Sequence, residues 1–349
     1  MNNTSYTGVR PLTPAPLMAM ADGFRVAKVL AVALDFDLFT KVSGTDGITA
    51  DELARTEGIA ERPARLLLTA CASLGLLDRH DGRYVNSAMA EEFLVRGKHY
   101  FFGDLVTFTD RREYDAWAKL DVAIRTNRPT TWNPETDETL FDPQDEHMAE
   151  LFPKAAHAGA VFTARAMALS VDFRPYRRLL DVGGGLGSFC GELCAHHPHL
   201  RATVYDLPFV ARMAEKRLAE TPLADRVDAK GGDFFADDLP TGYDAILLTN
   251  ILHDWNTEQG AALLAKCHTA LGSGGEVIIG EAFLDDDGTG PVAGAVAGLN
   301  MLVETAEGAN RSRAEYTALL TGAGFTDIRR VGFVIDAPLA NGALIARKP

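Results

Sequence analysis

A glycine-rich turn near the middle of the chain constrains the fold more than any other stretch. The apolar run that ends in Leu180-Asp181-Val182 is typical of a buried strand, and residues 189–194 repeat apolar side chains at helical spacing. The run Gly183-Gly184-Gly185-Leu186-Gly187 between them lets the backbone bend sharply. A strand, a glycine turn and a helix together bring backbone N–H groups close to a ligand. The sequence therefore predicts an α/β domain with a binding site at this turn.

The spacing of the glycines narrows the choice of ligand. A dinucleotide motif places glycine at the first, third and sixth positions of the turn. Counted from Gly183, the sixth position is Ser188, whereas the fifth is Gly187. The resulting order, Asp-x-Gly-x-Gly-x-Gly from Asp181, resembles the pattern of class I S-adenosylmethionine (SAM) methyltransferases, whose turn faces an amino acid and a sugar. A glycine turn without a ligand remains the alternative at this point.

The second half of the chain alternates strand-like and helix-like segments. Helical segments separate the first five strands, as in a parallel doubly wound sheet. The expected strands are 179–182, 203–206, 227–231, 245–248, 276–279, 328–334 and 343–346. Sheets of this kind bind ligands beyond the carboxyl ends of their strands.

Two acids stand at such strand ends. Asp206 ends the second strand, about as far along the chain from the glycine turn as the acid that binds a ribose in such folds. A carboxylate at this place can accept hydrogen bonds from both ribose hydroxyls. Asp233 ends the third strand, where it can accept from an adenine amino group while Phe234 lies against the ring. Alone, either acid could be a helix cap or a turn residue. Together with the glycine turn, they predict a SAM site.

Residues 1–100 predict a separate winged-helix domain. Residues 17–42 repeat apolar side chains at helical spacing, Thr49 is a candidate N-cap for a second helix, and a third helix starts at Glu61 and runs to Leu76. A hairpin with an Asp-Gly turn follows at 77–85. Winged helices often bind DNA, and the third helix carries two arginines. The domain is otherwise rich in acids, and the net charge of −14 disfavours contact with nucleic-acid phosphates. We expect dimerisation, with DNA binding as the alternative.

Residues 101–173 predict a helical linker that also walls a substrate pocket. Aromatic side chains recur along this segment, and such side chains can line a pocket for a flat apolar molecule. Core packing is the other explanation for each of them. They are Phe108, Tyr114, Trp117, Trp132, Phe141, Phe152 and Phe162. Residues 174–349 then form the SAM-binding domain.

The fourth strand runs into the most specific motif, Asn250-Ile251-Leu252-His253-Asp254-Trp255. With the motifs above, it resembles the plant-type O-methyltransferase family, which includes the caffeate, isoflavone and acetylserotonin enzymes and many bacterial natural-product enzymes. The resemblance spans nearly the whole chain. It implies a homodimer with a class I methyltransferase domain that methylates a hydroxyl, expected to be phenolic, of a small aromatic metabolite. It also implies that His253 is the general base and that Trp255 lies near the adenine.

The family holds its base with two acidic residues. One matches Glu281, at the end of the fifth strand, whereas the other is replaced by Asn310. An amide can orient an imidazole without stabilising its charge, and Glu304 or Glu307 could compensate. A neutral imidazole, with an ordinary pKa of about 6.5, suits a base at neutral pH. Three alternatives remain. The enzyme could methylate carbon or nitrogen, it could be a relative that uses SAM without transferring methyl, or the protein could be a regulator that senses SAM.

The resemblance also implies residues around each ligand. Those around the cofactor are Asp181, Gly183, Gly185, Asp206, Leu207, Gly232, Asp233, Phe234, Asn250 and Trp255. Those around the acceptor are Phe108, Trp117, His157, Asn300, Met301 and Glu304. The four cysteines form no Cys-x-x-Cys pair, so neither a metal nor a disulfide is expected. Without a recognisable signal peptide or an apolar run that could span a bilayer, a cytoplasmic location is expected.

Overall fold

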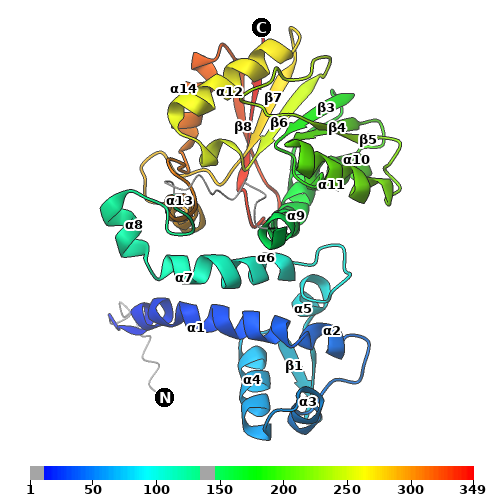
Figure 1. Cartoon of the computed structure of the whole chain (residues 1–349), viewed down its shortest axis with the longest axis vertical. Helices are drawn as coiled ribbons and strands as arrows, with labels where there is room; N and C mark the ends of the chain where they lie inside the picture. The colour runs from blue at the N-terminus through cyan, green and yellow to red at the C-terminus, as the bar shows by residue number, and fades with distance from the viewer. Residues whose placement is uncertain (1–11, 134–145) are drawn as a thin grey trace, which may run out of the picture. The chain divides into compact units, whose positions relative to one another are not determined.

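The computed structural model describes residues 12–133 and 146–349, with side chains described over 12–133 and 151–349. Residues 1–11 of the first predicted domain and Phe141 of the aromatic segment lie outside the described residues. The chain divides into two compact units, Met1–Lys98 and His99–Pro349, both drawn in Figure 1. The described part of segment 101–173 belongs to the second unit, together with the sheet.

The first unit has the helices and the hairpin that its sequence predicts. Its elements are α1 (Ala15–Asp35), α2 (Leu38–Val42), α3 (Ala50–Glu57), α4 (Glu61–Ser73), β1 (Leu77–His80), β2 (Arg83–Asn86) and α5 (Ala88–Phe93). Thr49 caps α3 through a reciprocal pair of hydrogen bonds with Glu52. The hairpin turns at Asp81 and Gly82, both with positive φ, as a two-residue turn between twisted strands requires.

The first helix is shorter than the sequence predicts. The apolar repeat over 17–42 predicts one helix, but Asp37 adopts a left-handed backbone with φ 51° and separates α1 from α2. Asp tolerates this conformation better than most residues. After the break, Leu38 and Phe39 are buried in the core of the unit. Helical periodicity alone does not reveal such a break, because the spacing of apolar residues continues across it.

The second unit is built on a mixed sheet with strand order β5-β4-β3-β6-β7-β9-β8. The strands are β3 (Arg178–Val182), β4 (Arg201–Asp206), β5 (Val227–Gly231), β6 (Ala245–Thr249), β7 (Glu276–Gly280), β8 (Thr326–Gly332) and β9 (Gly342–Arg347). Strands β3 to β7 pair in parallel, which confirms the predicted doubly wound arrangement, whereas β9 is antiparallel to both β7 and β8.

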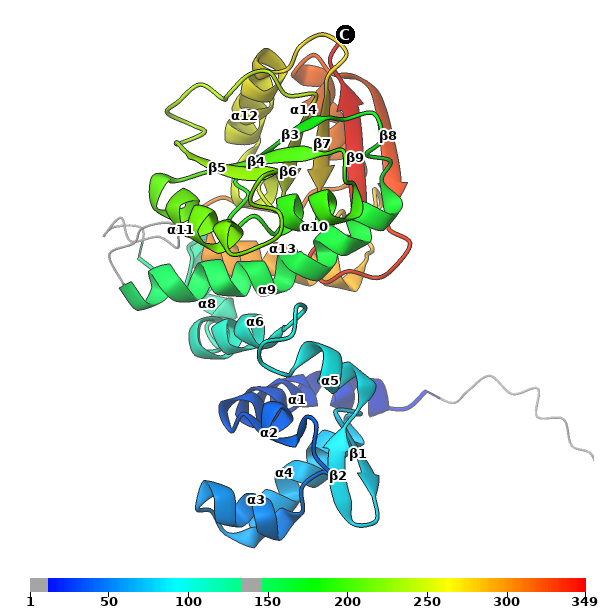
Figure 2. The same cartoon turned by 90° about the vertical axis from the view of Figure 1, so that its right-hand side faces the viewer.

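Helices cover both faces of this sheet, as Figures 1 and 2 show. Leu179 faces a core formed with α9 (Glu146–Ser170), α10 (Ser188–His196) and α11 (Pro208–Ala219). The next residue, Leu180, faces a second core formed with α12 (Thr257–Ala270) and α14 (Arg313–Gly322). Side chains alternate between the faces of a strand, so a continuous apolar run is what a sheet buried on both faces requires.

Further helices complete the second unit. They are α6 (Gly103–Phe108), the π-helix η1 (Thr109–Glu113), α7 (Tyr114–Trp117), α8 (Leu120–Thr126), the 3-10 helix η3 (Leu252–Asp254) and α13 (Val292–Glu304). The chain reverses its direction of travel across the sheet between β3 and β6, which are neighbours. The crevice beyond such a switch point is the usual ligand site of an open α/β sheet.

Candidate active site

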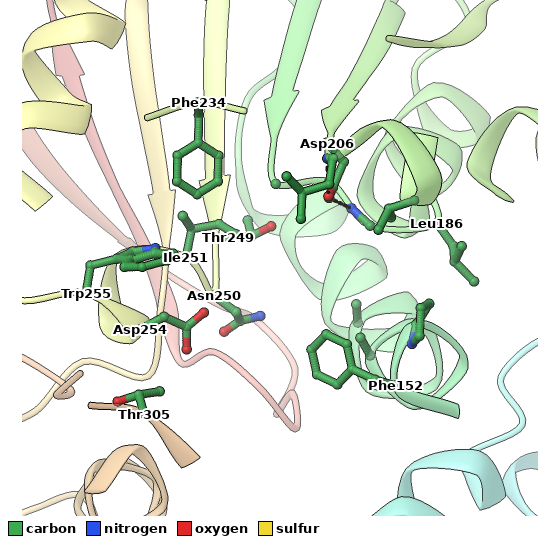
Figure 3. Close-up of a pocket in the computed structure, with 18 of the residues that line it drawn as sticks. Phe152, Leu186, Asp206, Phe234, Thr249, Asn250, Ile251, Asp254, Trp255 and Thr305 are labelled. Atoms are coloured by element: carbon green, nitrogen blue, oxygen red, sulfur yellow. Dashed lines mark hydrogen bonds between the residues drawn. The ribbon is translucent and has the colours of Figure 1, made fainter. Parts of the chain in front are cut away.

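A cavity of about 530 Å³ opens at the carboxyl ends of the parallel strands. The turn after β3 lines it, as do residues that follow β4, β5 and β6, residues of α9, and residues 304–307. In Figure 3, Asp206, Leu186 and Phe152 lie on one side, and Trp255, Asp254 and Thr305 lie on the other. The cavity thus occupies the switch point that the glycine turn predicts.

The carboxylate of Asp206 is fixed beside the glycine turn. Its Oδ2 accepts a hydrogen bond from the Gly185 N–H at 2.8 Å, which is the dashed line in Figure 3. Its Oδ1 accepts from the Leu207 N–H at 2.7 Å. Burial raises the pKa of Asp206, while these two backbone N–H groups lower it. The acid is therefore held in one orientation at the cavity wall.

The glycine turn needs its glycines for space as well as for conformation. Gly183 has φ 72°, and a Cβ there would clash with the adjacent side chain of Ile251. Asp181 lies behind the turn, fully buried and outside the cavity lining, where its Oδ2 accepts from the Cys190 thiol at 3.4 Å. Burial raises the pKa of Asp181 to about 7. Gly232 has a packing role of its own, because a Cβ there would clash with Tyr205.

An aromatic wall closes the cavity beyond β5. Asp233 lines the cavity, and its Oδ1 accepts from the Phe235 N–H at 2.8 Å. The ring of Trp255 packs edge-on against Phe235, with centroids 4.7 Å apart, and against Phe234 at 6.0 Å. These side chains form an apolar wall of rings packed edge to face, and Asp233 adds a carboxylate to the same lining.

His253 lies between two carboxylates at the ends of β6 and β7. Its Nδ1 is 2.7 Å from Oε2 of Glu281, and its Nε2 is 3.4 Å from Oδ1 of Asp254. Glu281 is fully buried, and its Oε1 accepts from the N–H groups of Ile251 and Leu252. Asp254 lines the cavity, whereas His253 lies just behind the lining with its side chain 16% exposed.

Arg311 fixes the short 3-10 helix that carries His253. Its Nη1 donates to the carbonyl of Leu252 at 2.7 Å, and its Nη2 donates to that of Trp255 at 2.6 Å. Arg311 is itself buried. The guanidinium therefore clamps both ends of the segment that positions the imidazole.

Asn310 and its neighbours do not supply the second acid. The Asn310 amide nitrogen donates to the carbonyl of Ala282 at 3.0 Å, and its buried oxygen has no hydrogen-bond partner among the described residues. Glu304 is 3.4 Å from Arg112, and Glu307 accepts from the Asn256 amide at 2.5 Å. The second carboxylate beside the ring is Asp254, so the expected compensation by Glu304 or Glu307 is replaced by the residue next in sequence to the histidine.

Only part of the expected acceptor set lines the cavity. His157 and Glu304 do so, whereas Phe108, Trp117, Asn300 and Met301 are outside its lining. Trp117 donates its Nε1–H to Asn300 at 2.7 Å, and Asn300 donates to Glu113 at 3.1 Å, so these side chains hold α7, α13 and η1 together. Phe108 packs behind the wall against Phe152, with centroids 5.8 Å apart.

Comparison with known proteins decides the family. Residues 18–96 match an O-methyltransferase dimerisation domain, and residues 117–326 match an O-methyltransferase domain. The chain belongs to the O-methyltransferase family. It is 42% identical over 346 residues to the 3-hydroxy-5-methyl-1-naphthoate 3-O-methyltransferase of Streptomyces sahachiroi, covering 99% of each chain. It is 33% identical to the tetracenomycin polyketide synthesis 8-O-methyl transferase TcmO of Streptomyces glaucescens, again over 99% of each.

A solved structure agrees with this family over the whole chain. Human N-acetylserotonin methyltransferase in complex with SAM superposes with a TM-score of 0.86 at 27% identity, covering 98% of this chain and 99% of the other. These matches confirm the resemblance stated from the sequence, and with it the class I methyltransferase fold and the N-terminal dimerisation domain. The chain is a SAM-dependent O-methyltransferase.

The electrostatics of this O-methyltransferase correct one expectation about its histidine. Burial alone lowers the pKa of His253, but the carboxylates of Glu281 and Asp254 outweigh it and raise that pKa to about 9. Burial also raises the pKa of Asp254 to about 6, against the opposing effect of His253. The two carboxylates therefore favour the protonated form of the resting imidazole, and the second of them is Asp254 rather than Glu304 or Glu307.

Other cavity residues had weaker signals in the sequence. Trp132 and Phe152 belong to the predicted aromatic segment, but nothing distinguished them from its core aromatics. Thr305 follows α13, and Leu339 belongs to the loop before β9, so both reach the cavity only through the tertiary fold.

Among the described residues, no His, Cys, Asp or Glu side chains form a cluster suited to a metal ion. In the same parts of the chain, no helix has the length and hydrophobicity to cross a membrane.

Proposed function

We propose that this O-methyltransferase methylates a phenolic hydroxyl on a small fused-ring aromatic metabolite, with His253 as the proton acceptor. The observation that carries the proposal is the pairing of His253 with Glu281 at 2.7 Å, directly behind the wall of a largely apolar cavity that includes several aromatic rings. The two bacterial relatives described above, named for a hydroxynaphthoate and for a tetracenomycin polyketide, support the acceptor class.

The residues of the cavity fit SAM along its length. Asp206 would accept hydrogen bonds from the ribose hydroxyls, since its oxygens face the cavity from a fixed carboxylate. Asp233, Phe234 and Trp255 would hold the adenine between a carboxylate and aromatic rings. The bare backbone at Gly183 would admit the ligand where a Cβ would force Ile251 aside. When bound, SAM supplies a methyl group already activated by its sulfonium.

The proton is the part of the reaction that the chain must manage. A phenol has a pKa of about 10, so transfer to an imidazole of ordinary pKa costs about 5 kcal/mol. Because Glu281 and Asp254 raise the pKa of His253 toward that of the phenol, this cost becomes smaller. Glu281 and Asp254 thus make the ring a base that matches its phenolic substrate. The consequence is that lowering the pH favours the protonated ring, which cannot accept the phenolic proton.

The test of this function is the position of the transferred methyl. We expect a hydroxynaphthoate probe incubated with the enzyme and SAM to give a singly methylated product whose methyl lies on oxygen by NMR. Methylation at carbon or nitrogen, or release of S-adenosylhomocysteine without methylated product, would support the alternatives that the sequence left open.

We propose further that the enzyme is a homodimer formed through its first unit. Large apolar side chains are exposed on α1, among them Leu17, Met20 and Phe24, and a helix with such a face needs a partner. The match of residues 18–96 to a dimerisation domain supports this assignment.

A further inference from the structure

A chain of hydrogen bonds joins three helices beside the glycine turn. Arg217 of α11 is 3.1 Å from Nε2 of His157 on α9, and Nδ1 of that ring is 2.6 Å from the hydroxyl of Ser188. The other Nη of Arg217 donates to the carbonyl of Leu186 at 3.2 Å. Ser188 is the first residue of α10, and both it and His157 line the cavity.

The chemistry of these groups fixes where each proton lies. A guanidinium can only donate, so Nε2 of His157 must accept. Burial, together with the charge of Arg217 and the proximity of His99, lowers the pKa of His157 to about 3, so the ring is neutral and carries its proton on Nδ1. Nδ1–H then donates to the Ser188 oxygen. The serine hydroxyl therefore keeps its own proton free to donate to a third group.

The charge of the cavity indicates what that third group is. Every charged side chain that lines the cavity within the described residues is acidic, namely Asp206, Asp233, Asp254, Glu304 and Glu307. SAM carries a carboxylate on its amino-acid part, and this group needs donors in an otherwise anionic cavity. The start of α10 supplies the positive end of a helix that no side chain caps. Ser188 lies at that end, and the ring of His157 connects its hydroxyl to the charged guanidinium of Arg217.

We propose that His157 and Arg217 are positioning residues that hold the Ser188 hydroxyl as a donor to the carboxylate of the amino-acid part of SAM. The proposal rests on the cofactor placement given under the proposed function. It assigns His157 to the cofactor site, whereas the sequence predicted that His157 contacts the acceptor. Neither residue takes part in the chemical step.

Two ligands distinguish a role in binding the carboxylate of SAM from a role in keeping the whole site folded. S-Adenosylhomocysteine has the amino-acid part, whereas 5′-methylthioadenosine keeps the adenosine and the sulfur and lacks it. In calorimetry on the full-length enzyme, His157→Leu should weaken S-adenosylhomocysteine about tenfold or more, as expected for a lost charge-assisted hydrogen bond. The affinity for 5′-methylthioadenosine should stay within about twofold of wild type.

Further variants keep the test sharp. Arg217→Met should show the same selective loss, and His157→Gln should restore much of the affinity, because an amide offers both an acceptor and a donor. Arg212→Met, on an exposed position of the same helix, should change neither ligand. Equal weakening of both ligands by His157→Leu, or no weakening of S-adenosylhomocysteine, would overturn the proposal. Asp206→Ala should weaken both ligands, and if it affects neither, the cofactor placement itself is wrong.

Discussion

At the scale of single residues, the proposed base is set by its two acidic neighbours. His253 has a pKa of about 9 because Glu281 and Asp254 stabilise its charged form against burial. The protonated ring must lose its proton before it can accept one from the acceptor. The rate of methyl transfer at saturating ligands should therefore rise tenfold per pH unit and level off near pH 9. Single-turnover rates between pH 6 and 10 measure this dependence.

Glu281→Gln provides the matched comparison for that pH profile. An amide has one acceptor oxygen, so it keeps the bond from Nδ1 only by giving up those from the Ile251 and Leu252 N–H groups, and it no longer raises the pKa of His253; the plateau should begin at a lower pH and at a lower rate. Near pH 7 the larger neutral fraction offsets the weaker base, and the loss should be modest. Ionisation of the acceptor is the same in both enzymes, so an unmoved plateau would mean that Glu281 does not tune the base.

At the residue scale, the sequence identified part of this site and missed part. The His-Asp-Trp motif and Glu281 were recognisable from their match to the family's motifs, and their positions at the ends of neighbouring strands explain why they meet. The role of Asp254 beside the ring was missed, since no spacing rule indicates that these two adjacent side chains of the 3-10 helix lie 3.4 Å apart. Phe108 and Trp117 looked like pocket residues because aromatic composition does not distinguish a cavity wall from the core behind it.

At the scale of elements, the turn from Leu252 to Trp255 depends on one buried side chain. Arg311 donates to carbonyls at both ends of this turn from two separate nitrogens, whereas a lysine would have to make both bonds from a single nitrogen. Arg311→Lys should therefore lower the turnover number about tenfold, the effect of about 1.4 kcal/mol from one buried hydrogen bond.

Arg313→Lys is the control for that change. Arg313 lies two residues away, is 55% exposed, and pairs with Asp286 on the surface. Exposed pairs of this kind contribute little, so turnover should stay at the wild-type level. Equal losses in both variants would show that the turn does not depend on the clamp from Arg311.

Strands were easier to predict than the elements that line the site. Each strand of the sheet was expected within two residues of its observed bounds, because runs of apolar residues buried on both faces leave a clear pattern. The break at Asp37 and the 3-10 helix at His253 were not predicted. Both depend on local backbone geometry that is selected by tertiary packing. The periodicity of apolar residues does not indicate this geometry.

At the scale of the whole molecule, α1 should bring two chains together. Light scattering at micromolar concentration should give about twice the mass of one chain, which is 37.6 kDa. Phe24→Asp places a charge on the exposed apolar face of α1 and should shift the enzyme toward monomers. Val334→Asp, at an exposed apolar site of the second unit, should leave the mass unchanged. A wild-type monomer at these concentrations would remove the proposed role of the first unit.

The central claim is that His253 accepts a phenolic proton, and the single-turnover rate of His253→Ala tests it most directly. With a hydroxynaphthoate acceptor at pH 7 to 9, the rate should fall about 10²- to 10⁴-fold, the usual contribution of a positioned base. The affinity for S-adenosylhomocysteine, measured on the same preparation, should stay within about twofold of wild type, because the ring lies behind the cavity lining. Near-wild-type methyl transfer by His253→Ala across this pH range would contradict the account.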